Sequence, residues 1–288
     1  MSEVLVTGAA GYIGSHVCKA LQESGHAVHG IDNYFHGESN DIIRYCETFS
    51  KFDIADVNDG APYDAVVHLA GRSVVPQSLK EPTEYYRVNA MGTNNLIENV
   101  LTPHVIFAST SSAFEMASPY ARSKVAAEDI IKEKCSGYTI FRFFNVSGSN
   151  GIHRQLGAAS HLIRRAAMVA AGKLPHIEIF GIDYDTRDGT CVRDYIHVSD
   201  LSNAIVSAVE NGPLNTPYEC LGGNVGYSVL EVIDAMQRVT GKNIDTLISP
   251  RREGDAVSSV VDNLSKRVTL TKSLEDMCLD QYNLELTL

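Results

Sequence analysis

A tyrosine and a lysine four residues apart, Tyr120 and Lys124, form the pair in this sequence best suited to acid–base chemistry. Residues i and i+4 of a helix share one face, with about 5–6 Å between their Cβ atoms, and Pro119 suits a helix start. A free tyrosine has a pKa of about 10, but a nearby ammonium favours the phenolate. Tyr120 could therefore remove a proton from a hydroxyl group while a hydride leaves the same carbon. Taken alone, such a pair is more often part of a solvated helix face.

A threonine ahead of this pair, Thr110, could relay the proton. It follows the apolar run 105–109, which predicts a strand, and ligands of open α/β sheets lie at the carboxyl ends of the strands. A Ser/Thr run such as residues 109–112 is more often only a polar loop. The position at the end of the strand is what favours Thr110 as a hydroxyl that hydrogen-bonds the reacting oxygen.

The segment from Thr7 to Gly14 has the spacing GxxGxxG, after an apolar run and before a helical stretch. Glycine permits a tight turn and lets backbone N–H groups approach a pyrophosphate at the start of a helix. Asp32 lies eighteen residues after Gly14, where a carboxylate can hold ribose hydroxyls. No arginine adjoins it to accept a 2′-phosphate, which favours NAD over NADP. The alternative is a glycine turn that only packs a helix on a strand.

The elements that must position these residues alternate between strand and helix. Apolar runs predict strands at 4–7, 27–31, 66–70, 105–108 and 138–143, and helical stretches lie at 12–23, 84–100 and 120–134. Such alternation is typical of a parallel sheet covered on both faces. In the second half we expect helices at 160–171 and 199–210, a strand at 177–180, and a capping box that begins at Ser228.

The predicted fold is a Rossmann-type doubly wound parallel sheet with a smaller C-terminal α/β substrate-binding domain. We expect residues 1–148 to form the NAD-binding domain, joined by segments that return from the second half around 190–210. Residues 149–288 would mainly form the substrate-binding domain.

Composition excludes several classes of function. The net charge of −11 argues against a nucleic-acid partner, which would call for a basic face. We expect no export signal and no membrane span, because no apolar run is long enough. Six scattered cysteines without a CxxC pair favour reduced thiols and a cytoplasmic location. The ten histidines show no metal-ligand spacing, so we expect no metal.

Motifs along nearly the whole chain resemble the extended short-chain dehydrogenase/reductase family, and within it most the UDP-glucose (UDP-galactose) 4-epimerases. The resemblance is carried by VLVTGAAGYIGSH at 4–16, IDN at 31–33, HLAG at 68–71, EYYRVNAMGT at 84–93, YARSK at 120–124, RFFN at 142–145, DGTCVRDYIHVSDL at 188–201 and PRREGD at 250–255. It implies oxidation at C4 of a UDP-sugar, rotation of the bound 4-keto sugar, and return of the hydride to its other face, with NAD as a retained cofactor.

The resemblance also implies residue roles. Tyr120 would be the catalytic base, Lys124 its partner and a ligand of the nicotinamide ribose, and Thr110 the hydroxyl relay. The cofactor would be held by Gly8, Gly11, Tyr12, Ile13, Gly14, Asp32, Asn33, Asp53, Ile54, Leu69, Ala70, Gly71, Asn89, Tyr120, Lys124 and Phe143. The UDP-sugar would be held by Asn145, His161, Leu162, Phe180, Arg193, Tyr195, Arg252 and Asp255. The stretches 84–100 and 120–134 match helices that pair in family dimers, so we expect a homodimer.

The sequence departs from the family at a few positions. Ala113, Phe114 and Glu115 replace the usual VYG, and the loop that leads from them to Tyr120 is short. Ser73 stands where these epimerases often have a lysine. Ser259 matches a position where narrow-specificity epimerases have a tyrosine, so the resemblance predicts that UDP-N-acetylhexosamines are accepted alongside UDP-hexoses.

Three other functions stay open. A 4,6-dehydratase would have Asp-Glu directly after the relay threonine, where this chain has Ser111 and Ser112. A UDP-glucuronate decarboxylase typically has a glutamate at the position of Ser112. A non-catalytic NAD sensor commonly lacks the tyrosine and lysine that are present here.

Overall fold

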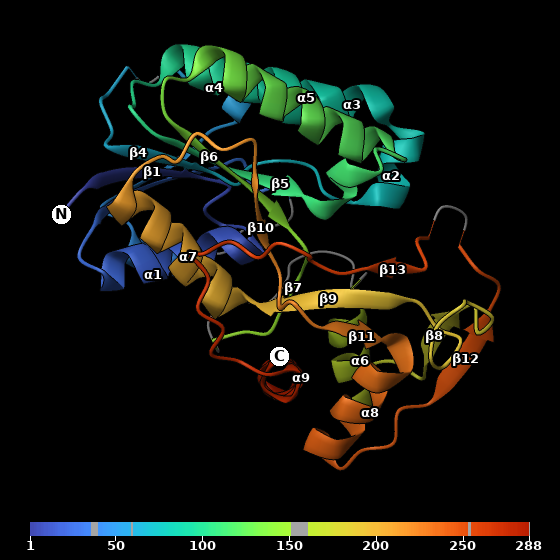
Figure 1. The fold of residues 1–288 in the computed structure, drawn as a ribbon. Helices are drawn as coiled ribbons and strands as arrows, with labels where there is room; N and C mark the ends of the chain where they lie inside the picture. Colours follow the sequence, from blue (N-terminus) through green and yellow to red (C-terminus); the bar gives the residue numbers. More distant parts are fainter. Residues whose placement is uncertain (36–39, 59, 151–160, 253–254, 288) are drawn as a thin grey trace. The chain divides into compact units, whose positions relative to one another are not determined.

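The computed structural model describes residues 1–35, 40–58, 60–150, 161–252 and 255–287. The chain divides into two compact units, drawn in Figure 1. The first consists of Met1–Phe143 and Ser202–Cys220, and the second of Phe144–Leu201 and Leu221–Leu288. The segment that joins the first unit from the second half of the chain is thus 202–220. The assignment of the units to cofactor and substrate stays a prediction.

A seven-stranded sheet forms the centre of the first unit. Its order is β10-β6-β5-β4-β1-β2-β3, and β1 to β6 pair in parallel. The strands are β1 (Glu3–Thr7), β2 (Ala27–Asp32), β3 (Thr48–Lys51), β4 (Ala65–His68), β5 (Val105–Thr110), β6 (Tyr138–Phe143) and β10 (Glu219–Leu221). The order 3-2-1-4-5-6 is that of a Rossmann fold, so the predicted fold class is confirmed.

Helices cover both faces of this sheet. Figure 1 shows α3 (Pro82–Tyr86), α4 (Gly92–Asn99) and α5 (Pro119–Lys134) on one face and α1 (Tyr12–Glu23) on the other. The short helix α2 (Val75–Lys80) and the 3₁₀ turns Asn40–Tyr45, Ile54–Asp56 and Ser111–Phe114 complete the unit. Apolar clusters fill the layers between sheet and helices, and the one under α5 joins Phe107 and Ile140 to Ala127 and Ile131.

Two helical stretches of this unit carry residues predicted to act in catalysis or to bind the cofactor. Helix α5 begins where its signals place it, because the Ser118 side chain caps the N–H of Ala121 and Pro119 fits the first turn. The helical stretch predicted at 84–100 is confirmed, since residues 82–99 are helical throughout, and it contains a π-helical turn, Arg87–Met91, between α3 and α4. The buried Asn89 lies in this turn and bonds residues outside the helix, and such π turns often occur at functional sites.

The second unit is arranged around β9 (Val192–His197). This strand pairs in parallel with β7 (Asn145–Ser147) and β13 (Ser258–Ser259) and antiparallel with β11 (Gly226–Ser228). A separate parallel pair joins β8 (Ile177–Phe180) to β12 (Thr246–Ser249). Helices α6 (Leu162–Ala170), α8 (Val229–Thr240) and α9 (Leu274–Leu286) enclose an apolar core that includes Tyr195. Helix α7 (Val198–Asn211) runs from this unit into the first.

The second unit contains two helix starts that the sequence predicts. The capping box at Ser228 is confirmed, because Ser228 caps the N–H of Glu231 and the Glu231 carboxylate accepts the Ser228 N–H. The helix expected at 160–171 is described from Leu162 to Ala170, and Ser160 lies outside the described residues.

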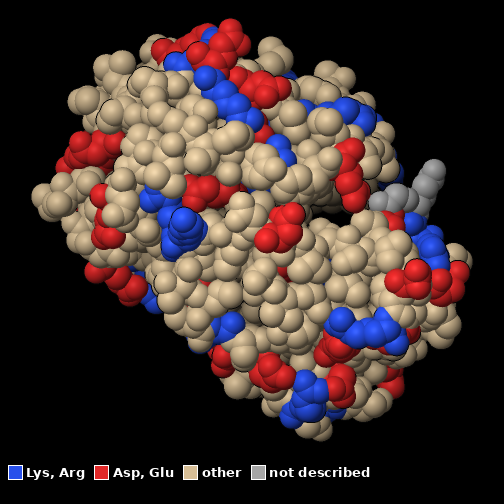
Figure 2. Space-filling model, viewed as in Figure 1, with Lys and Arg blue, Asp and Glu red and all other residues tan. Residues whose placement is uncertain are grey.

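The molecular surface carries charges of both signs. On the face shown in Figure 2, lysine and arginine side chains lie among aspartates and glutamates, without a continuous basic surface among the described residues. None of the helices in the described part of the chain has the length and apolar character needed to cross a bilayer.

Candidate active site

The glycine turn after β1 folds back tightly on itself. Gly8 has a φ of +70°, and a Cβ atom there would lie 2.7 Å from the backbone nitrogen of Ala70. A Cβ on Gly14 would lie 2.0 Å from the Gly8 carbonyl oxygen. Both positions therefore require glycine. Helix α1 starts after Gly11 with no capping side chain and no carboxylate in its first turn, which suits an anionic ligand.

Asp32 connects this turn to the end of β2. One carboxylate oxygen accepts the N–H of Ala10 at 3.0 Å, and the other accepts the N–H of Tyr34 at 2.7 Å. The next residue, Asn33, donates to the carboxylate of Asp53 at 2.9 Å. The structure thus brings Asp32, Asn33 and Asp53 to the same edge as the glycine turn. Ile54 is buried, and its side chain lies against Gly92.

A buried histidine holds the parts of this edge together. The sequence alone assigns it no role. His68 lies 2.7 Å from the hydroxyl of Thr7 through Nδ1 and 2.8 Å from that of Thr93 through Nε2. Burial, and after it the charge of Lys124, lowers the pKa of His68 to about 3. The neutral ring therefore ties β1 to helix α4. The sequence feature that could have pointed to this role is the position of His68 in the HLAG motif.

Gly71, the last residue of HLAG, lies against the predicted catalytic residues. A Cβ there would be 2.9 Å from Asn89 Oδ1 and 3.1 Å from Lys124 Nζ. Asn89 also donates to the hydroxyl of Ser123 at 2.9 Å and to the carbonyl oxygen of Arg72 at 3.0 Å. Leu69, Ala70, Gly71, Asn89 and Lys124 are thus neighbours, as predicted for residues along one cofactor. With the glycine turn and Asp32, they fit a dinucleotide.

Tyr120 and Thr110 are neighbours. The partly buried Tyr120 ring packs edge-on against Tyr85 with 6.3 Å between centroids. Burial raises the pKa of Tyr120, and the nearby Thr110 hydroxyl opposes that rise. The sequence predicts that Lys124 favours the phenolate of Tyr120, but in the structure burial has the larger effect on this pKa. Thr110 and Tyr120 nevertheless lie near each other, as a proton relay requires.

Lys124 lies one turn along α5 from Tyr120. Its Nζ donates to the carbonyl oxygen of Ala108 at 2.9 Å and lies 4.8 Å from the centroid of Phe107. Burial lowers the pKa of Lys124 to about 8, and the negative charge of Glu128 opposes this. Lys124 is therefore a buried amine that can hold or release a proton near neutral pH.

The residues that replace the usual VYG form a compact turn. Phe114 packs edge-on against Tyr218, with 5.4 Å between ring centroids. The Arg142 guanidinium lies 3.9 Å from the Tyr218 centroid and 4.7 Å from that of Phe114. Phe143, at the end of β6, is buried. The shortened segment is thus anchored and leads directly into the cap of α5.

The predicted substrate residues of the second unit form two groups. Arg193 lies 3.7 Å from the Asp255 carboxylate and is in register with Ser259 on the neighbouring strand. The Arg252 guanidinium lies 3.6 Å from the centroid of Phe180. Each group pairs an arginine suited to pyrophosphate with a second predicted residue.

The remaining predicted substrate residues lie on β7, on β9 and at the start of α6. Asn145 is in register with Tyr195 and donates to the Asp194 carbonyl oxygen at 2.9 Å. Leu162 packs on the core that includes Tyr195. His161 is the N-cap residue of α6, and no hydrogen bond or ion pair of the described residues joins it to the other predicted substrate residues.

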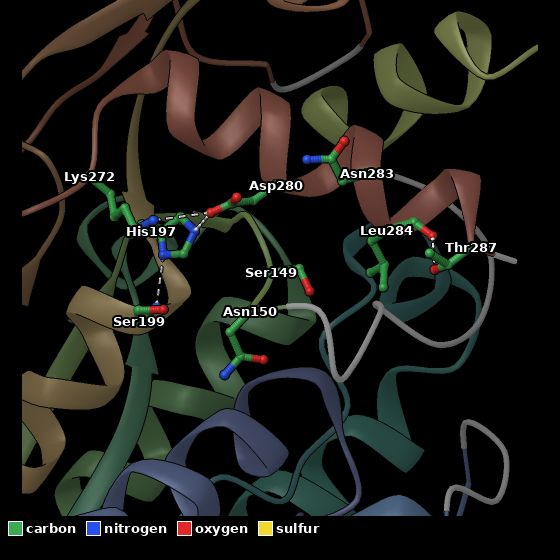
Figure 3. Close-up of a pocket in the computed structure, with 9 residues that line it drawn as sticks. All are labelled: Ser149, Asn150, His197, Ser199, Lys272, Asp280, Asn283, Leu284 and Thr287. Carbon is green, nitrogen blue, oxygen red and sulfur yellow. Dashed lines mark hydrogen bonds and ion pairs between the residues drawn. The ribbon is translucent and has the colours of Figure 1, made fainter.

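A pocket in the second unit, drawn in Figure 3, contains none of these residues. His197 Nε2 lies 3.2 Å from the Asp280 carboxylate, and Lys272 Nζ lies 3.3 Å from it. The N–H of Ser199 donates to His197 Nδ1 at 3.0 Å. The lining of this pocket thus shares no residue with the predicted substrate site.

Comparisons with known proteins identify the family. The family described as "NAD dependent epimerase/dehydratase family" matches residues 4–220. UDP-glucose 4-epimerase from Halalkalibacterium halodurans is 36% identical, over 97% of this chain and 94% of that protein.

Two of the solved structures that are similar to this chain cover nearly all of it. UDP-glucose-4-epimerase from Stenotrophomonas maltophila, solved with bound NAD and formylated UDP-arabinopyranose, has a TM-score of 0.89 at 32% identity and covers 99% of this chain and 98% of its own. The UDP-Glc/GlcNAc 4-epimerase from Campylobacter jejuni has a TM-score of 0.80 at 31% identity and covers 100% of both chains. With its glycine turn, Asp32 and the Tyr120–Lys124 pair, this chain belongs to the NAD dependent epimerase/dehydratase family.

Proposed function

We propose that the protein is an NAD-dependent UDP-sugar 4-epimerase that interconverts UDP-glucose and UDP-galactose. The observation that carries the proposal is the placement of Tyr120 and Lys124 one helical turn apart on α5, with Lys124 Nζ bonded to the Ala108 carbonyl oxygen of β5 and Thr110 at the end of the same strand. Relatives over nearly the full chain that are named UDP-glucose 4-epimerase support the same reaction. Bound NAD supplies the hydride acceptor that takes hydrogen from sugar C4 and returns it.

The chain's own residues handle the proton. The C4 hydroxyl gives its proton to Tyr120, directly or through the nearby Thr110 hydroxyl. Burial raises the pKa of Tyr120 and so favours the neutral phenol. A positive charge beside the ring favours the phenolate, which is the form that accepts the sugar proton. Lys124 supplies one such charge while it is protonated, and Tyr120 returns the proton when the opposite face of the ketone is reduced. Both directions use the same residues.

Binding groups on the chain set the orientation. Asp32 would hold the ribose hydroxyls of the adenosine, since its carboxylate lies at the glycine turn. Arg193 and Arg252 would hold the pyrophosphate of the sugar nucleotide, since a guanidinium binds phosphate oxygens in a bidentate manner. The 4-keto sugar would turn about this pyrophosphate between the two hydride transfers.

The substrate range includes acetylated sugars in this proposal. Ser259 is half-buried on β13, in register with Arg193. A serine there occupies less volume than a tyrosine and leaves room for an N-acetyl group. Similarity to the UDP-Glc/GlcNAc 4-epimerase supports this range. We also propose a homodimer and a cytoplasmic location, the latter because all six cysteines are free thiols.

The test incubates purified protein separately with UDP-glucose, UDP-galactose and their N-acetyl forms and identifies the products by NMR. We expect C4 inversion of each sugar with no net change of cofactor. Loss of water or of carbon dioxide from a suitable nucleotide sugar would instead identify a dehydratase or a decarboxylase. Bound NAD with no turnover of any sugar would indicate a sensor.

A further inference from the structure

Strand β5 and helix α5 meet at three successive residues of the strand. Thr110 lies near Tyr120, and the Ala108 carbonyl oxygen accepts a hydrogen bond from Lys124 Nζ at 2.9 Å. Between these two residues of the strand, Ser109 donates to the Glu128 carboxylate at 2.5 Å. Tyr120, Lys124 and Glu128 are spaced by four residues and therefore share one face of α5. The mechanism proposed above uses Thr110, Tyr120 and Lys124 and gives Ser109 and Glu128 no role.

Glu128 is a fully buried carboxylate with a complete set of partners. Its side chain is 0% exposed, and Arg142 binds both of its oxygens, each at 2.9 Å. Lys132 lies 3.3 Å away. Burial raises the pKa of Glu128, but the hydrogen bonds from Arg142 and Ser109 outweigh burial and the pKa is lowered. Glu128 therefore carries a negative charge at neutral pH.

Arg142 is itself fixed from a second side. Its guanidinium lies over the rings of Tyr218 and Phe114. Arg142 is also in register with Ser109 across β5 and β6. Glu128 thus binds two neighbouring strands through residues that lie side by side, next to the strand end that carries Thr110. A displaced Glu128 would release that end.

The charge of Glu128 also acts on Lys124. Burial lowers the pKa of Lys124 to about 8, and Glu128 raises it. The other titratable groups near this lysine are Tyr120 on the same helix and His68 on β4. His68 stays neutral because its pKa is lowered to about 3. Among the described residues, Glu128 is therefore the anion that favours the ammonium form of Lys124.

We propose that Glu128 is a positioning residue for the Tyr120–Lys124 pair: it fixes the end of β5 through Ser109 and holds Lys124 in its ammonium form. The inference rests on the proposed function, in which the phenolate of Tyr120 needs a positive neighbour. Glu128 touches neither sugar nor cofactor in this scheme. It acts through Ser109 and Lys124.

The first readout is the titration of Lys124 itself, which does not depend on turnover. Protein labelled with [ε-13C]lysine is titrated by NMR, and the Lys124 signal is identified by its absence in Lys124→Met. In Glu128→Gln we expect the Lys124 midpoint to move to lower pH. Glu128→Asp should restore part of the shift. Ser109→Ala keeps the charge and should leave the midpoint unchanged.

The second readout is the pH dependence of kcat. The alkaline limit of kcat should move to lower pH in Glu128→Gln, with a loss of roughly tenfold at the wild-type optimum. Ser109→Ala should lower kcat without moving that limit. If Glu128→Gln does not fold, because Arg142 is left unpaired, Glu128→Gln/Arg142→Met removes both charges and is measured instead.

An unchanged Lys124 midpoint in a folded variant without the Glu128 charge would overturn the proposal, whatever the activity. Failure of the wild type to epimerise any sugar would overturn the proposed function, and the NMR titration would still report on the charge of Glu128. The two failures are therefore distinguishable.

Discussion

The buried ammonium of Lys124 donates a hydrogen bond to the carbonyl oxygen of Ala108 across 2.9 Å. One hydrogen bond and the ring of Phe107 replace the water that would solvate this charge in the unfolded chain. The pKa of about 8 in the folded protein reflects that loss. Lys124 is thus retained at a cost in stability, which is typical of residues kept for function.

Lys124→Met should therefore stabilise the protein while abolishing epimerisation. The folded pKa of about 8 lies below the ordinary value of 10.5, so wild-type stability rises as pH increases from about 8 to 10.5. Below pH 8 the charged lysine costs about 3 kcal/mol. Chemical denaturation across this pH range measures the difference between variant and wild type. A variant that is less stable at every pH would contradict the assignment.

Tyr120→Phe should remove the proton acceptor and leave the fold intact. We expect kcat to fall roughly 10²- to 10⁴-fold, with NAD affinity largely retained, because the ring and its contact with Tyr85 remain. Steady-state epimerase assays and NAD titration measure the two effects. The exposed tyrosine of α3, in Tyr86→Phe, is the control and should keep full activity. An active Tyr120→Phe enzyme would exclude Tyr120 as the base.

Gly14→Ala should destabilise the first unit, because its Cβ would lie 2.0 Å from the Gly8 carbonyl oxygen. A backbone atom cannot move aside as the end of a side chain can. We therefore expect the free energy of unfolding to fall by about 2 kcal/mol or more. The matched control is Gly11→Ala, whose Cβ lies 3.1 Å from the same oxygen. It should fold nearly normally and bind NAD more weakly. Thermal unfolding with and without NAD separates these outcomes, and equal stability of both variants would be inconsistent with the turn described.

Stability in acid should depend on His68. Because its folded pKa of about 3 lies below the ordinary 6.5, its contribution is complete above pH 6.5 and is lost as pH falls toward 3. His68→Gln should be less stable than wild type at pH 7, since the hydrogen bonds to Thr7 and Thr93 change. The difference in stability between His68→Gln and the wild type should become smaller as the pH falls. Denaturant midpoints at pH 7 and pH 4.5 test this, and a constant gap would refute it.

Ser259→Tyr should narrow the substrate range. The larger side chain next to Arg193 would reduce the space for an N-acetyl group. We expect kcat/KM for UDP-N-acetylhexosamines to fall roughly tenfold or more relative to UDP-glucose. The neighbouring exposed residue supplies the control in Ser258→Tyr. If both classes of sugar respond equally to Ser259→Tyr, Ser259 does not set the range.

Local patterns explain what could be read without the structure. The spacing of Gly8 and Gly14 encodes a tight turn at the start of α1, and the four-residue spacing of Tyr120 and Lys124 places them on one face of α5. The alternation of strands and helices was enough for the parallel sheet. Each of these depends on residues close together in the chain.

Tertiary structure decided the contacts that tune the site. Ser109, Glu128 and Arg142 meet only because β5 and β6 adopt one register and α5 packs across them. The pKa of Tyr120 rises through burial, which spacing from Lys124 cannot reveal. The π turn at Asn89 likewise lies within a predicted helical stretch whose periodicity does not reveal it. Sequence period thus determined which residues share a face, whereas charge and burial at the site depend on partners distant in the chain.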